Sequence, residues 1–258
     1  MKDPGLTGSF GFPWGRPHRT PSRAVKSPPK QGERPTSRQL VLTSRVSGFV
    51  NSILASRLGP RGTVVLILAG IVACIYLNSL GNGFVEWDDP GLILRNRQIR
   101  SLEWSNIKEI FSVRRASTYQ PIRVLSYAVD YHFWKLNPLG YHITNIAFYL
   151  LTCILVFFFA EELLKFLRRE GTPQSNTRIA FLAALLFAVH PVHVESVTWL
   201  SARKEVLVGF FFFASLYCYL KATDATRRET KSSLYGLAFL CFVMAVLSKP
   251  VAVALPGI

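Results

Sequence analysis

The chain has 258 residues; half of them are apolar, only 17% are charged, and the net charge is +15 at pH 7. This composition excludes an ordinary soluble domain, which carries more charge. The apolar residues gather in five uncharged stretches: 63–80, 143–160, 179–189, 206–220 and 234–247. Because about 20 consecutive apolar residues cross hydrocarbon, we predict an all-α polytopic membrane protein. The alternative, a soluble fold, would have to bury five such helices in one small domain.

The positive charge is concentrated near the N-terminus, where residues 1–62 hold eleven Lys and Arg against two acids. Basic residues that flank spans stay on the cytoplasmic side of a membrane. We therefore predict a cytoplasmic N-terminus and an outer loop at 81–141, between the first and second apolar stretches. Nucleic acid is not an expected partner, because the basic block adjoins a span and carries no recognisable binding motif.

Two segments precede the membrane domain, which we place at 63–258. Residues 1–37 contain seven prolines among Gly, Ser, Arg and Lys, and such a composition predicts a disordered cytoplasmic tail. Residues 38–59 carry apolar side chains at helical spacing, with arginines off that stripe. This pattern indicates an amphipathic helix on the anionic inner leaflet, although a plain linker is the alternative.

The outer loop contains two further helical patterns. In the first, Trp104, Ile107 and Ile110 share one face. The second starts at Pro121, because proline is favoured as a first helical residue, and it stops before Asn137. We expect both helices to lie in the plane of the membrane, on its outer surface.

The third apolar stretch, 179–189, is too short to cross a bilayer unless residues 191–199 continue it. We expect the third and fourth spans to be joined outside by residues 190–205, so alternating spans bring three polar clusters to the outer side: the acids after Phe84, the segment 190–205, and Lys249. Ionisable residues at membrane depth are costly and usually mark function. We therefore predict the functional site on this side.

The acidic cluster is the stretch FVEWDDP, residues 84–90, with Glu86, Asp88 and Asp89. Adjacent carboxylates repel each other, so near a low dielectric the pKa of one of them should rise. A raised pKa suits a group that transfers protons. Ordinary turn formation by Asp-Asp-Pro is the competing interpretation.

The basic candidates are Arg203, Lys204 and Lys249, which would present fixed positive charge to a phosphate. If 192–203 is helical, Glu195 lies on the same face as Arg203. Snorkelling of long basic side chains to the membrane surface is the alternative for all three.

Two histidines, His190 and His193, lie close to these basic residues in the chain. They could bind a metal only with Glu195 as a third ligand, and Pro191 separates them. We therefore interpret them as hydrogen-bonding core histidines rather than as a metal site. A divalent metal near the two adjacent aspartates is left open.

Five motifs occur in order along the chain: NGFVEWDDP (82–90), YQPIR (119–123), LNPLGYHITN (136–145), AVHPVHVESVTW (188–199) followed by RKEVL (203–207), and LSKP (247–250). Together, from about residue 63 to the end, they resemble the membrane domain of the transmembrane and tetratricopeptide-repeat O-mannosyltransferases, and more closely that family's bacterial relatives. The resemblance implies a type C glycosyltransferase-like helical bundle and a polyprenyl-phosphate-linked sugar as the donor. The chain departs from animal members at Gln120, where they tend to have Arg, and this leaves the sugar and the acceptor open.

The family's site residues carry over position by position. The resemblance implies Asp88 as the catalytic base, supported by Asp89. It implies Arg203 as a ligand of the donor phosphate, with Lys204 and Lys249 as further candidates. The supporting residues without an assigned role are His190, His193, Glu195 and Tyr119.

We thus expect a glycosyltransferase that moves a sugar, mannose or similar, from polyprenyl phosphate to a protein Ser or Thr hydroxyl on the non-cytoplasmic face. The expected partners are membrane lipid, the donor and an acceptor protein, and no cofactor is assigned. The expected location is a bacterial inner membrane, or the endoplasmic reticulum membrane in a eukaryote. The alternatives are a non-catalytic scaffold whose tetratricopeptide repeats bind partners, and a transporter. The apolar ending VAVALPGI further predicts that the sequence is C-terminally truncated.

Overall fold

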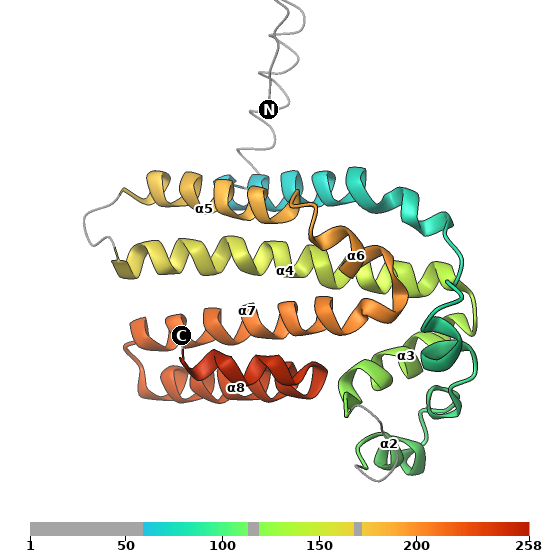
Figure 1. Cartoon of the computed structure of the whole chain (residues 1–258). Coiled ribbons are helices and arrows are strands. Elements are labelled where there is room, and N and C mark those ends of the chain that lie inside the picture. The colour runs from blue at the N-terminus through green and yellow to red at the C-terminus, as the bar shows by residue number, and fades with distance from the viewer. Residues whose placement is uncertain (1–58, 113–118, 168–171, 258) are drawn as a thin grey trace, which may run out of the picture. The chain divides into compact units, whose positions relative to one another are not determined.

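The computed structural model describes residues 59–112, 119–167 and 172–257, all of which fall within the unit Val50–Ile258. The tail predicted at 1–37 and, apart from Gly59, the amphipathic helix predicted at 38–59 lie outside the described residues. Within the described residues every regular element is a helix (Figure 1), which confirms the all-α prediction.

Four helices of the described residues are long and apolar enough to cross a membrane. They are Gly59–Gly81, α4 (Pro138–Leu167), Leu200–Asp224, which contains α7 (Arg203–Asp224), and α8 (Arg228–Ser248). No more than 33% of the most apolar part of any of them is buried inside the protein. Apolar helices with such open surfaces suit a lipid surrounding, so the prediction of a polytopic membrane protein is confirmed.

The third apolar stretch forms α5 (Pro173–Ala188), which has only 16 residues. Residues 191–199 do not continue it, because the helix ends before Val189 and helical structure resumes only in the short α6 (His193–Thr198). Pro191 explains the break. Proline has no amide N–H, and its ring disfavours helical backbone in the residue before it.

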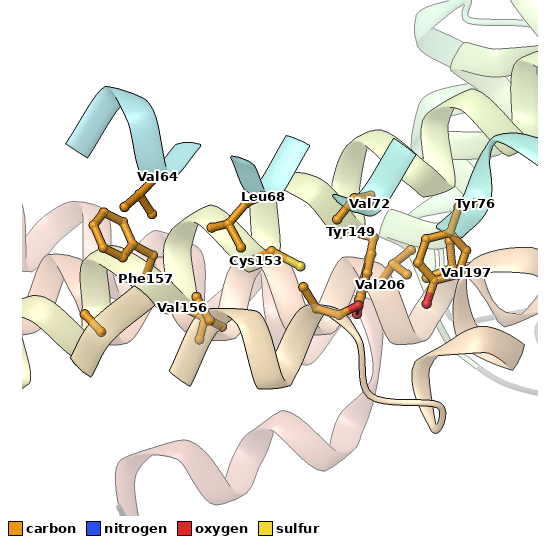
Figure 2. Close-up of a cluster of buried hydrophobic side chains, with 13 residues drawn as sticks. Val64, Leu68, Val72, Tyr76, Tyr149, Cys153, Val156, Phe157, Val197 and Val206 are labelled. Carbon is orange, nitrogen blue, oxygen red and sulfur yellow. Dashed lines mark hydrogen bonds between the residues drawn. The ribbon is translucent and has the colours of Figure 1, made fainter. Parts of the chain in front are cut away.

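The long helices pack side by side, with α4 between α5 and α7, and with α8 against α7 (Figure 1). The first helix buries one face in a seam that repeats every four residues: Val64, Leu68, Val72 and Tyr76. This spacing places side chains on one face of a helix. The same buried cluster includes Tyr149 and Phe157 of α4 (Figure 2), and the rings of Tyr76 and Tyr149 lie 5.2 Å apart.

Short elements gather at one end of the long helices (Figure 1). The first helix ends in η1 (Leu77–Gly81), and η2 (Pro90–Leu94), η3 (Arg97–Ile99), α2 (Trp104–Ile110) and α3 (Pro121–Trp134) follow it. The helices α2 and α3 are the two that the loop pattern predicted. Two more short elements flank the last helices: η5 (Leu200–Ala202) precedes α7, and η6 (Pro250–Gly257) follows α8.

A second buried cluster joins this end together. It includes Ile93, Tyr127, Tyr141 and Leu200, which come from η2, α3, α4 and η5. Because these apolar residues fix the loop elements against the long helices, the polar side chains between them are held in defined positions.

Candidate functional site

The two adjacent aspartates have different surroundings. Asp89 is fully buried, and its carboxylate accepts a hydrogen bond from the Val85 amide at 2.8 Å and another from the Ser201 hydroxyl. Asp88 is exposed, and its backbone carbonyl accepts the first bonds of the following helical turn. Asp89 therefore ties the acidic loop, residues 84–90, to η5, while the Asp88 carboxylate is accessible for chemistry.

Arg203 is fully buried at the start of α7, where its guanidinium contacts two other helices, α3 and α4. Its Nη1 donates to the Asp130 carboxylate of α3. Its Nε donates to Asn145 Oδ1 and its Nη2 to the Tyr141 carbonyl, both of α4 and both at 2.8 Å. The guanidinium carbon also lies 4.7 Å from the centre of the Tyr127 ring. These contacts make Arg203 a clamp between α3, α4 and α7.

The sequence interpretation placed Glu195 and Arg203 on one helical face, and this is wrong. The backbone is extended at Trp199, with a ψ of 119°, so α6 and α7 are separate helices. Glu195 is exposed on α6, whereas Arg203 points into the protein.

The partner of Arg203, Asp130, was not among the predicted site residues. It is buried on α3 and also accepts a hydrogen bond from Thr144 Oγ1 at 2.7 Å. One signal could have found it, because Asp130 is the only acid in the mostly apolar stretch 121–136. An isolated acid in an apolar helix usually has a buried partner.

The two lysines lie near the same end. Lys249 follows α8, and its Nζ is 2.7 Å from both carboxylate oxygens of Glu205, in the first turn of α7. Lys204 is half-buried next to Arg203. The structure thus brings Lys249 to the start of α7, as the predicted site requires, while the phosphate role of both lysines stays a prediction.

Of the two predicted core histidines, His193 lies partly buried among aromatic rings, whereas His190 is exposed, so the core interpretation is wrong for His190. The His193 ring centre lies 4.4 Å from that of Phe187 and 5.6 Å from that of Tyr149. Burial and the nearby His190 lower the pKa of His193. His190 Nδ1 accepts a hydrogen bond from the Val192 amide at 3.2 Å. In the described part of the chain, no group of three or more His, Cys, Asp or Glu is placed to hold a metal ion.

The fourth supporting residue, Tyr119, lies just before α3. Its hydroxyl donates a hydrogen bond to the Phe111 carbonyl at 3.1 Å. Tyr119 therefore links the entry to α3 with the end of α2 and does not contact the acidic loop through this bond.

A pocket of about 430 Å³ opens beside the acidic loop. It is lined by Asn82, Val85, Trp87, Glu195, Thr198 and Trp199. Trp87 is 79% exposed, and the buried Nε1 of Trp199 has no hydrogen-bond partner among the described residues. The pocket therefore offers an exposed aromatic surface at Trp87, the residue before Asp88 in the chain, which suits a ligand with an apolar face.

Comparison with known proteins finds relatives along most of the chain. The protein O-mannosyl-transferase Tmtc3 of Drosophila melanogaster is 30% identical over 224 residues, which is 77% of this chain and 24% of the relative. The mouse protein O-mannosyl-transferase TMTC3 is 30% identical over 75% of this chain and 20% of its own length. The human protein O-mannosyl-transferase TMTC4 is 27% identical over 76% of this chain and 28% of its own length.

No family model matches the chain, and no solved structure matches it either. The helices and the polar cluster at their end define an α-helical multi-pass membrane protein with buried polar residues at one end of its bundle. With the relatives just described, the chain belongs to the transmembrane and tetratricopeptide-repeat O-mannosyltransferase family. It spans between a fifth and about a quarter of the length of these relatives.

Proposed function

We propose that this chain is part of a membrane glycosyltransferase that moves a sugar, mannose or similar, from a polyprenyl-phosphate donor to a Ser or Thr hydroxyl of a protein. The relatives described above are named protein O-mannosyl-transferases, which supports the transfer of a sugar to protein. We place the N-terminus in the cytoplasm and the site on the opposite face of the membrane. That membrane is a bacterial inner membrane, or the endoplasmic reticulum membrane in a eukaryote.

One observation carries the proposal: Asp88 is exposed while the adjacent Asp89 is buried and bound to Ser201. The buried aspartate holds the loop, and the exposed one is free to accept a proton. The pocket lined by Trp87, the residue before Asp88, offers room for a substrate at this loop. This difference in burial supports Asp88 as the base and Asp89 as a positioning residue.

In the proposed reaction, the acceptor hydroxyl oxygen attacks the anomeric carbon of the sugar. The bond from that carbon to the phosphate oxygen breaks, its electron pair stays on the phosphate, and the Asp88 carboxylate takes the hydroxyl proton. Base catalysis of this kind contributes about 10²–10⁴-fold to a rate. Stabilisation of the departing phosphate by positive charge is the larger contribution.

The basic residues divide between positioning and binding. The guanidinium of Arg203 already donates to three acceptors, so we assign it to holding α3, α4 and α7 together. Lys204 and Lys249 keep the proposed role in attracting the donor phosphate. This assignment needs no metal ion to balance the reaction.

A transfer assay with the full-length protein tests the proposal. The protein in lipid nanodiscs is given labelled polyprenyl-phosphate mannose and a Ser/Thr-rich acceptor, and addition of one hexose is scored by mass. The wild type and the control Glu103→Gln should transfer the sugar. Glu103 is an exposed acid of the longer segment 81–141 and lies outside the acidic loop. Asp88→Asn should not.

The two alternative functions give different results. If the protein is a scaffold, neither the wild type nor any variant will transfer sugar from the labelled donor. A transporter would move labelled donor or sugar across proteoliposomes without forming a product. Either result would overturn the proposed glycosyltransferase.

A further inference from the structure

Two arginines are buried at this end of the bundle, and they differ in their partners. Arg203 is fully buried and its guanidinium is engaged by three acceptors. Arg123, on α3, is 5% exposed, and its Nε has no hydrogen-bond partner among the described residues. A buried guanidinium N–H without an acceptor is costly, because burial removes the hydration of the Arg123 Nε and no hydrogen bond replaces it. A ligand that supplies the acceptor would offset that cost.

Arg123 lies at the start of a helix that is itself uncapped. It is the third residue of the 14-residue α3, whose N-cap, Gln120, makes no side-chain hydrogen bond to the first turn. The first amide groups of a helix have no partner within the helix and carry partial positive charge, so they favour anions. Helical side chains lean toward the N-terminus, which directs Arg123 toward the same end of α3.

Gln120 adds a second unused polar group. It is buried, and its Oε1 has no hydrogen-bond partner in the described structure. An amide oxygen accepts hydrogen bonds and does not bind anions. The first turn of α3 therefore combines a cation with a neutral acceptor, which matches a phosphate joined to a hydroxyl-bearing group.

The acidic loop lies within electrostatic reach of this turn. Burial lowers the pKa of Arg123, while the nearby Tyr127 and Asp88 act to raise it. No ion pair is formed between Arg123 and Asp88 in the described structure, so neither neutralises the other by direct contact. An anion held at Arg123 would lie within electrostatic reach of the carboxylate that we propose as the base.

We propose that Arg123 binds the phosphate of the polyprenyl-phosphate sugar and that Gln120 accepts a hydrogen bond from a sugar hydroxyl. This inference rests on the proposed glycosyltransferase function and names a binding residue for it. It also explains the two unpartnered groups. The phosphate of the lipid-linked sugar would accept a hydrogen bond from Arg123, and a sugar hydroxyl would donate one to Gln120 Oε1.

Binding of the donor's lipid product tests the inference without requiring transfer. Full-length protein in nanodiscs is titrated with polyprenyl phosphate, with polyprenol and with inorganic phosphate. The variants are Arg123→Gln, Arg123→Lys and the control Arg97→Gln, an exposed arginine of the same loop. Size-exclusion profiles and melting temperatures of all proteins are measured before titration.

The wild type and Arg97→Gln should bind polyprenyl phosphate far more tightly than polyprenol or inorganic phosphate. Arg123→Gln should weaken polyprenyl-phosphate binding by about 10- to 100-fold, as expected for loss of a charged hydrogen bond. Arg123→Lys should lose less, because it keeps the charge. Equal affinity in wild type and both Arg123 variants would overturn the inference, and so would wild-type binding of inorganic phosphate in preference to polyprenyl phosphate.

The same proteins separate this inference from the proposed function. If Arg123→Gln loses lipid-phosphate binding while even the wild type transfers no sugar, the binding site stands and the glycosyltransferase fails. If the wild type transfers sugar and Arg123→Gln does so with an unchanged donor KM, the glycosyltransferase stands and the role of Arg123 fails.

Discussion

Ser201 and Asp89, 112 residues apart in the chain, are joined by a hydrogen bond from the Ser201 hydroxyl to the buried Asp89 carboxylate. This bond connects the loop after the first helix to the segment that leads into α7. It holds Asp88 at the end of the bundle where Arg203 clamps α3, α4 and α7.

The neighbouring aspartates should respond differently to truncation. Asp89→Ala leaves the Val85 amide and the Ser201 hydroxyl without their acceptor, so we expect a loss of about 1–3 kcal/mol in the free energy of unfolding. Asp88→Ala, at an exposed position, should change it by less than about 0.5 kcal/mol. Denaturation in mixed micelles measures both. Similar losses in the two variants would show that Asp89 does not anchor the loop.

Arg203 should contribute far more to the free energy of unfolding than an exposed arginine does. Arg203→Gln leaves Asp130 as a buried charge without its partner, and such a loss costs about 3–5 kcal/mol. Adding Asp130→Asn should recover part of this cost, because the double variant no longer buries a lone carboxylate. Unfolding of the single and double variants measures the coupling, and Arg97→Gln is the control. An Arg203→Gln protein as stable as this control would contradict the clamp.

The pH dependence of stability should report His193. Its pKa in the folded protein lies below its ordinary value of 6.5, so the unfolded chain binds the proton more readily. The contribution of His193 to stability is therefore present above about pH 6.5 and is lost as the pH falls. Melting temperatures between pH 7.5 and 5.5 should fall less in His193→Gln than in the wild type. The exposed His132→Gln should behave like wild type, and identical profiles in all three would refute the assignment.

Lys249 should affect the affinity for the sugar donor more than the stability of the protein. Its ion pair with Glu205 is about one-third exposed on both sides, so Lys249→Gln should cost less than about 1 kcal/mol of stability. If Lys249 attracts the donor phosphate, the affinity for polyprenyl phosphate should fall severalfold. Lys221→Gln, which removes an ion pair at the other end of α7, is the matched control. Unchanged affinity in Lys249→Gln would remove it from the phosphate site.

Much of the fold follows from patterns within single segments. Uncharged apolar runs located the four long helices, and Pro121 marked the start of α3. The helix α4 is longer than its apolar run of 143–160 because buried polar residues extend it at both ends, with His142 near its start and Glu161 near its other end. A hydropathy pattern treats such residues as loop.

The site was harder to predict, because it depends on contacts between distant segments. Asp89 and Arg203 stood out by their residue types, but the side chains that bind them, Ser201 and Asp130, lie 112 and 73 residues away in the chain. Burial cannot be read from residue type. The resemblance implied Arg203 as a phosphate ligand, and in the structure its guanidinium donates to three acceptors of the protein, whereas Arg123 in the YQPIR motif has an Nε without a partner among the described residues.

The most direct test of the account is a single-turnover measurement at saturating donor. Full-length wild type, Asp88→Asn and Glu103→Gln are loaded with labelled polyprenyl-phosphate sugar, and transfer begins on addition of the acceptor. The account predicts a rate about 10²–10⁴-fold lower in Asp88→Asn, with unchanged donor binding and a wild-type rate in Glu103→Gln. An unchanged transfer rate in a folded, donor-loaded Asp88→Asn protein would contradict Asp88 as the base.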